Sequence, residues 1–199
     1  MTGPEPTGAV PTGAGPTGAV PTGAVPTGAD RAAGPDSPPV DEDAFRAAVG
    51  RLPAGVAVVT VVRRGVAHAT TVNSVASVSL DPPLLLFSVH ADSRLREVLD
   101  DVDGWAVSVL ADDQADVADW LASPGRPAVG QLDRVPHTAA PVSGAPWIAG
   151  AAAWFDCRTV AVHGAGDHDV VVGAVRAVAQ GGAAAGGLVH LRGRVRGVR

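Results

Sequence analysis

The chain has 199 residues, a formal net charge of −5, a single cysteine, no tyrosine and no lysine. This acidic balance argues against general nucleic-acid binding, and no apolar run approaches the ~20 residues of a membrane-spanning helix. The lone Cys157 excludes an internal disulfide and favours a reducing, cytoplasmic compartment. We therefore expect neither nucleic acid nor a membrane among the partners.

The first part of the chain is a short-period repeat. Residues 6–30 read PTGAV, PTGAG, PTGAV, PTGAV and PTGAD, with little apolar surface and no aromatic side chain. Such a segment cannot bury enough surface to offset roughly 1–2 kcal/mol of backbone entropy for each ordered residue. The sequence therefore predicts a disordered tail over residues 1–40 and one folded domain over residues 41–199.

The first half of the predicted domain mixes short helices and strands. Apolar side chains at positions 45, 48, 49 and 52 have helical spacing, and Pro53 ends the pattern. The β-branched run at 54–62 predicts a buried strand that returns over 66–72. Beyond a polar stretch we expect a strand over 84–89 and a helix over 93–100, capped by Asp92 or Ser93.

The second half is predicted to be mostly strands. We expect a strand over 104–110, a helix over 113–121 and a long, proline-broken loop over 123–146. Two long apolar strands, 151–162 and 168–178, form a central hairpin, and a short strand follows at 188–191. The arginine-rich end is interpreted as a solvated terminus rather than an RNA-binding segment. Many strands with few, short helices predict a mainly β fold, a barrel with helices over its ends.

Motifs of several common catalytic and metal sites are absent. The sequence has no P-loop, HExxH, CxxC or GxSxG pattern. His163 and His168 flank one turn, but no third metal ligand accompanies them. We therefore predict no metal site.

The densest polar stretch reads TTVNSVASVSLDPP, from Thr70 to Pro83. Its compact donors, with little bulk to block neighbouring backbone N–H groups, suit a phosphate and a flat heterocycle rich in acceptors. The competing interpretation is an edge strand followed by a turn rich in serine and threonine. The small polar side chains are Thr70, Thr71, Asn73, Ser74, Ser77 and Ser79.

Two smaller polar clusters follow. At His90-Ala91-Asp92-Ser93-Arg94, the Ser93 hydroxyl, the helix amides and the Arg94 guanidinium are candidates for holding an anion. Plain helix capping beside a solvated arginine explains the same residues. At Gly166-Asp167-His168-Asp169, His168 lies at a hairpin tip and is able to donate to a carboxamide or a phosphate. The alternative is a turn histidine with no function.

Three segments, in this order, resemble the flavin reductase-like family. They are FRAAVGRLPAGVAVVT, TVNSVASVSLDPPLLLFSV and AWFDCRTVAVHGAGDHDVVVGAV, and the resemblance runs from Phe45 to about Arg194. It implies the FMN-binding split β-barrel, a Greek-key-like fold with short flanking helices. It further implies an NAD(P)H-dependent flavin reductase that supplies reduced FMN or FAD to a separate flavin-dependent monooxygenase. NADH or NADPH would be the co-substrate, and the protein would be a homodimer with its site near the subunit interface.

The resemblance also implies roles for particular residues. The stretch between Thr71 and Ser79 would line the flavin ring and ribityl chain, and His90 to Arg94 would hold the phosphate end. His168 would lie near the nicotinamide as the candidate catalytic residue. Because hydride transfer depends on positioning two flat rings, we expect no acid–base dyad. The cofactor-binding residues implied are Thr71, Val72, Asn73, Ser74, Val75, Ser77, Val78, Ser79, His90, Asp92, Ser93 and Arg94.

Some positions depart from the family pattern. Trp120 and Leu121 stand where Arg-Phe is common, and residues 126–135 lack the aromatic side chains usual there. Two other functions stay open at this point. One is a flavin-binding or electron-relay protein without reductase turnover, and the other is an interaction protein in which the repeat is the working part.

Overall fold

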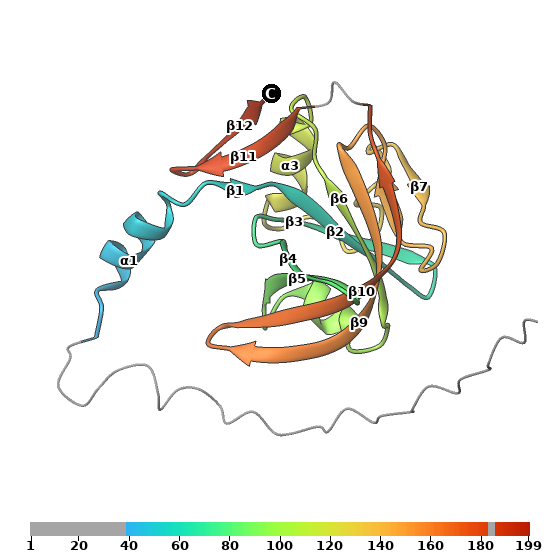
Figure 1. Cartoon of the computed structure of the whole chain (residues 1–199), viewed down its shortest axis with the longest axis horizontal. Coiled ribbons are helices and arrows are strands. Elements are labelled where there is room, and N and C mark those ends of the chain that lie inside the picture. The colour runs from blue at the N-terminus through green and yellow to red at the C-terminus, as the bar shows by residue number, and fades with distance from the viewer. Residues whose placement is uncertain (1–38, 183–185) are drawn as a thin grey trace, which may run out of the picture.

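A computed structural model of the chain describes residues 39–182 and 186–199, so nearly all of the predicted tail lies outside the described residues. In the described part, strands far outnumber helices (Figure 1). None of the described helices is long and apolar enough to cross a membrane. The helices are α1 (Glu42–Val49), α2 (Arg94–Leu99) and α3 (Ala115–Ala122). The strands are β1 (Ala54–Gly55), β2 (Ala57–Arg63), β3 (Val66–Val72), β4 (Ala76–Leu80), β5 (Pro83–His90), β6 (Gly104–Val109), β7 (His137–Ala139), β8 (Pro146–Ile148), β9 (Ala153–Ala165), β10 (His168–Gln180), β11 (Gly187–Leu191) and β12 (Arg194–Val198).

One large antiparallel sheet dominates the fold. Its order is β3-β2-β6-β9-β10-β5-β4, so the β9–β10 hairpin is central, as expected. The strands at its two edges, β3 and β4, follow each other in the chain but are not hydrogen-bonded to one another in the described structure. A second sheet, β1-β11-β12, lies at one end of the molecule, and β7 pairs with β8 (Figure 1). The mainly β fold is confirmed, with a sheet whose edge strands leave it unclosed.

Strand β2 is apolar except at Thr60 and at its last residue, Arg63, because both of its faces are covered. Val59 and Val61 pack in one core cluster with Leu95 of α2. Val58 points the other way and packs in a second cluster with Leu121 of α3. Alternate side chains of a strand lie on opposite faces, so an unbroken apolar run marks a strand buried on both sides. The two helices thus cover opposite faces of the sheet.

Two features differ from the sequence-based expectation. The strand expected over 54–62 is interrupted at Val56, because its N–H donates to Leu188 and its carbonyl oxygen accepts from Leu110, each at 3.0 Å. As a result, β1 and β2 belong to different sheets. The loop expected over 123–146 contains β7 and the start of β8, which form a short ladder.

The arginine-rich end is also different from the expectation. It was predicted to be a solvated terminus, but β12 pairs with β11 from Leu191↔Arg194 to Gly187↔Val198. The connecting residues Arg192 and Gly193 have φ of 54° and 71°. Positive φ at both positions of a two-residue turn matches the twist of a β-hairpin, and Gly at the second position favours it. This Arg-Gly pair was the signal that the sequence analysis missed.

Candidate functional site

A pocket of ≈ 250 Å³ lies where β3, the start of α2 and the loop after α3 meet. No aspartate or glutamate of the described residues lines it, although the chain is acidic overall. The polar side chains around it are His68, Thr70, Ser93, Arg94, Ser123, Arg126 and Gln131. We call this site the anion pocket.

The loop that forms one wall is fastened to the open edge of β3. The Gln131 side-chain oxygen accepts from the Ala69 N–H at 3.0 Å, and Arg126 donates to the Ala69 carbonyl at 3.2 Å. Gly125 and Gly130, each with φ of 76°, supply left-handed turns that other residues rarely adopt. Because side chains alternate along β3, burying Ala69 on the α3 side turns His68 and Thr70 toward the pocket.

The opposite wall comes from the first residues of α2. Ser93 caps this helix, as predicted, and its hydroxyl oxygen accepts from the Arg96 N–H at 3.2 Å. The hydroxyl hydrogen stays available to donate to a bound anion. Arg94 reaches across the pocket, where it contacts the Arg126 carbonyl oxygen at 3.5 Å. Because α2 has only six residues, we assign anion binding to these side chains rather than to the helix dipole.

Positive charge in the pocket is not balanced from within it. Burial, followed by the nearby charge of Arg94, lowers the pKa of Arg126. Burial also lowers the pKa of His68, with Arg94 and Arg63 acting in the same direction. The buried Arg126 Nε and His68 Nδ1 have no hydrogen-bond partner among the described residues. The unpartnered Arg126 Nε is a cationic donor and fits a phosphate group.

Lowering the pH should destabilise the protein through His68. The folded state holds the pKa of His68 below its ordinary 6.5, so in that range the unfolded chain binds more protons. This contribution to stability is therefore present above about pH 6.5 and is lost as the pH falls. We expect the midpoint of thermal unfolding to fall less between pH 8 and about pH 5 in His68→Gln than in the wild type. His163→Gln, at an exposed position, is the control, and equal pH dependence in all three proteins would contradict the expectation.

Two of the predicted ring-binding hydroxyls make hydrogen bonds within the fold. The Thr71 hydroxyl donates to the Ala118 carbonyl of α3 at 2.8 Å. The Ser74 hydroxyl donates to the Ser88 carbonyl and accepts from the Ser88 N–H, both at 3.0 Å. These bonds hold β3 against α3 and extend the pairing of β5 beyond β4. In this structure, the two hydroxyl groups fix the backbone conformation of the segment between β3 and β5.

The backbone of the same segment offers free hydrogen-bonding groups. Strand β4 pairs only with β5, and its register shifts between Ser77 and Ser79, which leaves Val78 as the extra residue. The N–H and carbonyl groups on its outer side therefore face no strand. The N–H and carbonyl groups of Ala69 point away from β2. Those of Thr71 point the same way, because outward-facing backbone groups recur at every second residue of an antiparallel edge strand. Exposed Asn73, whose amide lies 3.3 Å from His190 Nδ1, connects the two edges.

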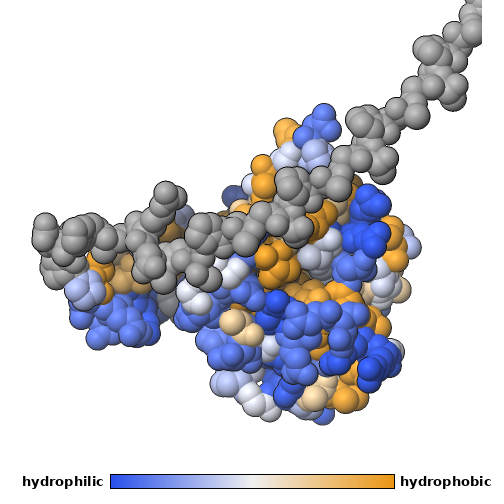
Figure 2. All heavy atoms as spheres, turned by 90° about the horizontal axis from the view of Figure 1, so that it is seen from below, coloured by the Kyte–Doolittle hydropathy of each residue, from blue (hydrophilic) through white to orange (hydrophobic). Residues whose placement is uncertain are grey.

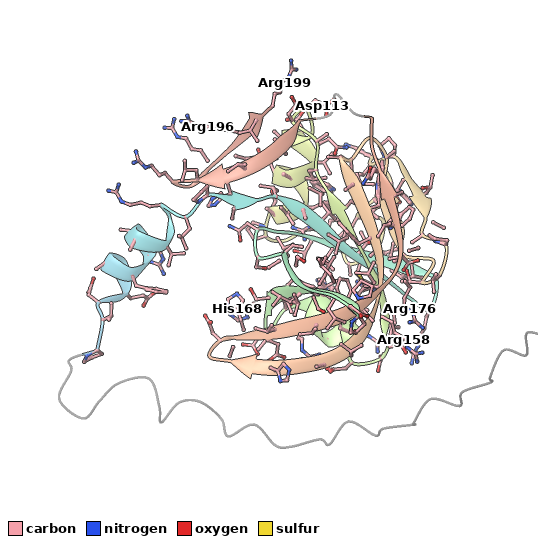
Figure 3. The ribbon with its side chains drawn as sticks, in the orientation of Figure 1. Asp113, Arg158, His168, Arg176, Arg196 and Arg199 are labelled. Atoms are coloured by element: carbon pink, nitrogen blue, oxygen red, sulfur yellow. The ribbon has the colours of Figure 1, made fainter. Side chains whose placement is uncertain are left out.

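The third predicted cluster lies at the tip of the β9–β10 hairpin. His168 is partly exposed there (Figure 3), and its Nδ1 lies 2.7 Å from the Asp167 carboxylate. This hydrogen bond is the main reason that the pKa of Asp167 is lowered. The His168 ring packs edge-on against His90, with centroids 5.3 Å apart, and the Ala91 N–H donates to the Asp167 carbonyl. The tip is thereby fixed beside the segment that leads into the anion pocket.

The predicted residues thus lie in three neighbouring places, which are the anion pocket, the open edges of β3 and β4, and the tip of the β9–β10 hairpin. Ser93 and Arg94 line the anion pocket, whereas His90 and Asp92 lie on the hairpin side of it. His68, Arg126 and Gln131 also line the pocket, although no sequence pattern predicted them there. Arg126 and Gln131 lie in a loop with no periodic pattern, so only the contacts with Ala69 reveal their place. The remaining predicted residues, Val72 and Val75, pack against the core cluster under α2.

The sheet and its pocket define a β domain with a site whose side chains suit a phosphate group. Comparison with known proteins identifies its family, because residues 49–199 match the flavin reductase like domain. The chain belongs to the flavin reductase-like family.

Characterised relatives and solved structures agree with this assignment. The NADH-dependent FMN reductase AsuE2 of Streptomyces nodosus subsp. asukaensis is 42% identical over 150 residues, which are 75% of this chain and 80% of that protein. BorF, the flavin reductase component of a bacterial two-component tryptophan halogenase, is 38% identical with a TM-score of 0.75, over 79% of this chain and 98% of that one. The NADH:FAD oxidoreductase SgcE6 of Streptomyces globisporus, solved with NAD and FAD fragments, is 35% identical with a TM-score of 0.75, over 80% and 93%.

Proposed function

We propose that this protein is an NAD(P)H-dependent flavin reductase whose anion pocket holds the phosphate end of FMN or FAD. The observation on which this rests is the pocket of Arg94, Arg126 and Ser93, which holds no acidic side chain of the described residues and in which the buried Arg126 Nε has no acceptor among them. Membership of the family and the reductase relatives support the same conclusion. A bound flavin supplies the chemistry, since it accepts a hydride from the reduced nicotinamide.

The residues of the chain bind and orient rather than exchange protons. Arg94 and Arg126 neutralise the phosphate, and Ser93 donates its hydroxyl hydrogen to it. The outer peptide groups of Thr71 and β4 lie at the open sheet edges, where they offer donors and acceptors to the polar edge of the ring. His168, fixed by Asp167 and His90, is placed to orient the nicotinamide nucleotide. Such alignment of two flat rings provides much of the rate enhancement.

Flavin turnover distinguishes a reductase from an electron-relay protein. Steady-state NADH and NADPH oxidation should be measured with catalytic protein and a large excess of free FMN or FAD. The proposal predicts many turnovers for each protein molecule and a rate that saturates with free flavin. A rate that does not respond to added flavin would instead favour a protein that keeps its FMN bound.

The proposed partner is a separate flavin-dependent monooxygenase that receives the reduced flavin. The relatives include several reductase components of such two-component systems. The single chain carries one flavin reductase-like match, over residues 49–199. A cytoplasmic location, inferred from the lone cysteine, stays a prediction.

We also propose a homodimer in which a second copy covers the apolar side of α1. Phe45 is 61% exposed, Leu52 is 64% exposed, and no residue of α1 is buried. The helix stands apart from the strands (Figure 1), and hydrophobic surface is also visible on the body of the molecule (Figure 2). An amphipathic helix is stable when its apolar face is covered, so a partner surface is expected here.

Sedimentation velocity tests this homodimer. The wild type should sediment as a dimer at micromolar concentration, and Phe45→Asp should shift the distribution toward monomer, because a charge in an apolar interface is costly. Arg46→Asp, on the charged side of the same helix, is the matched control. A monomeric wild type, or equal behaviour of both variants, would contradict this assembly.

A further inference from the structure

A second cavity, of ≈ 540 Å³, shares Gln131 with the anion pocket. Its apolar walls come from Val117 and Trp120 of α3, together with Pro127 and Val135. Trp120 is 40% exposed, which is unusual for so large an aromatic side chain. We call this the tryptophan cavity.

Buried Gln131 fixes the tryptophan cavity relative to the anion pocket. Its side chain bonds the Ala69 N–H and the Pro127 carbonyl, at 3.0 and 2.8 Å. Its own carbonyl oxygen accepts from the Trp120 indole N–H at 2.8 Å. The indole ring is therefore held in the cavity wall by the same residue that fastens the loop to β3.

The two cavities differ in chemical character. Among the described residues, the anion pocket presents Arg94 and Arg126 and no carboxylate, whereas the tryptophan cavity presents two carboxylates, Asp116 and Asp133, together with Arg134, beside an aromatic ring. Carboxylates repel a phosphate but accept from an exocyclic amino group. A flat base stacks on an indole face. The tryptophan cavity thus suits an aminopurine, next to a site that suits phosphate.

We propose that Trp120 is the stacking platform for the adenine base of a dinucleotide, and that this dinucleotide is FAD. The inference rests on the proposed function, because it takes the anion pocket to hold the flavin phosphates. One ligand then fills both cavities, with its phosphates at Arg94 and Arg126 and its adenine on Trp120. FMN lacks the adenosine half and leaves the tryptophan cavity empty, so the protein should bind FAD more tightly than FMN.

Equilibrium binding of FAD and FMN tests this platform. Trp120→Leu should raise the Kd for FAD about thirtyfold, the middle of the range for base stacking on an aromatic side chain. It should leave the Kd for FMN nearly unchanged, and Trp120→Phe should keep most of the preference for FAD. Trp147→Leu is the matched control, since its partly exposed indole also donates to a main-chain oxygen but lies outside the cavity.

The outcomes separate this inference from the function on which it rests. A wild type that binds FMN, together with a Trp120→Leu variant that binds FAD as the wild type does, would overturn the platform and leave the reductase standing. Equal weakening of FMN and FAD would also overturn it. NADH carries the same base, so the KM for NADH is measured with FMN as acceptor. If only that KM rises, the platform serves the nicotinamide nucleotide and the assignment to FAD is wrong. A wild type that binds neither flavin would overturn the function and the platform together.

Discussion

Replacing Arg94 by glutamine is expected to raise the Kd for FMN roughly tenfold, and the double variant with Arg126→Gln roughly a hundredfold. A hydrogen bond to a charged group contributes about 1.5–3 kcal/mol, and the exposed Arg94 belongs at the lower end of that range. Glutamine keeps much of the length and polarity of arginine, and Arg94 is exposed, so Arg94→Gln should leave the fold unaffected and lower the affinity through the lost charge. Arg126→Gln also removes the hydrogen bond to the Ala69 carbonyl, so the fold of the double variant is checked first by circular dichroism. Isothermal titration of the purified variants measures both constants.

Riboflavin provides the control ligand for this experiment because it lacks the phosphate. Its Kd should be nearly the same in the wild type and in both variants. Arg176→Gln provides the control protein, since Arg176 is an exposed arginine of β10 outside the anion pocket (Figure 3). If riboflavin weakens as much as FMN, the two arginines do not act on the phosphate, and the site has been placed wrongly.

Replacing Trp105 by alanine is expected to lower the free energy of unfolding by about 3–5 kcal/mol. Trp105 of β6 is fully buried, packs edge-on against Phe87 with ring centroids 4.9 Å apart, and donates to the Thr159 hydroxyl at 3.0 Å. Its ring occupies the space in front of Gly173 in β10, where an added Cβ would lie 2.3 Å from the ring. Urea unfolding followed by circular dichroism measures the loss.

A double-mutant cycle tests whether the two residues fit each other. Gly173→Ala should destabilise the wild type by about 1–3 kcal/mol through overpacking. In the Trp105→Ala background the same change should cost much less, because the ring that it strikes is gone. Additive effects would show that the contact between β6 and β10 does not limit the size of residue 173.

The fold was predictable to the extent that its elements carry local signals. The run that contains Val58, Val59 and Val61 predicts a strand buried on both faces, and Ser93 predicts the start of α2. The break at Val56 carries no such signal, because it is set by partners more than 50 residues away, at Leu110 and Leu188. Strand β12 did carry one, the Arg-Gly turn, but its charged side chains suggested a solvated end.

The candidate site was only partly predictable, for a related reason. Ser93 and Arg94 stand beside a helix start, so their place follows from local structure. Arg126 enters the pocket only because Gly125 and Gly130 fold its loop over the edge of β3. The backbone partners of the Thr71 and Ser74 hydroxyls could not be predicted, because hydroxyl groups that bond the backbone and those that bond a ligand look the same in sequence.

Rapid mixing without oxygen tests the central claim most directly. The protein, at a small fraction of the flavin concentration, is mixed with free FMN or FAD and NADH, and the loss of the oxidised flavin absorbance is followed. A flavin reductase bleaches the whole flavin pool over many turnovers, and we expect Arg94→Gln to do so more slowly at flavin concentrations below saturation. Bleaching that stops at one flavin for each protein molecule, or that is no faster than without protein, would contradict it.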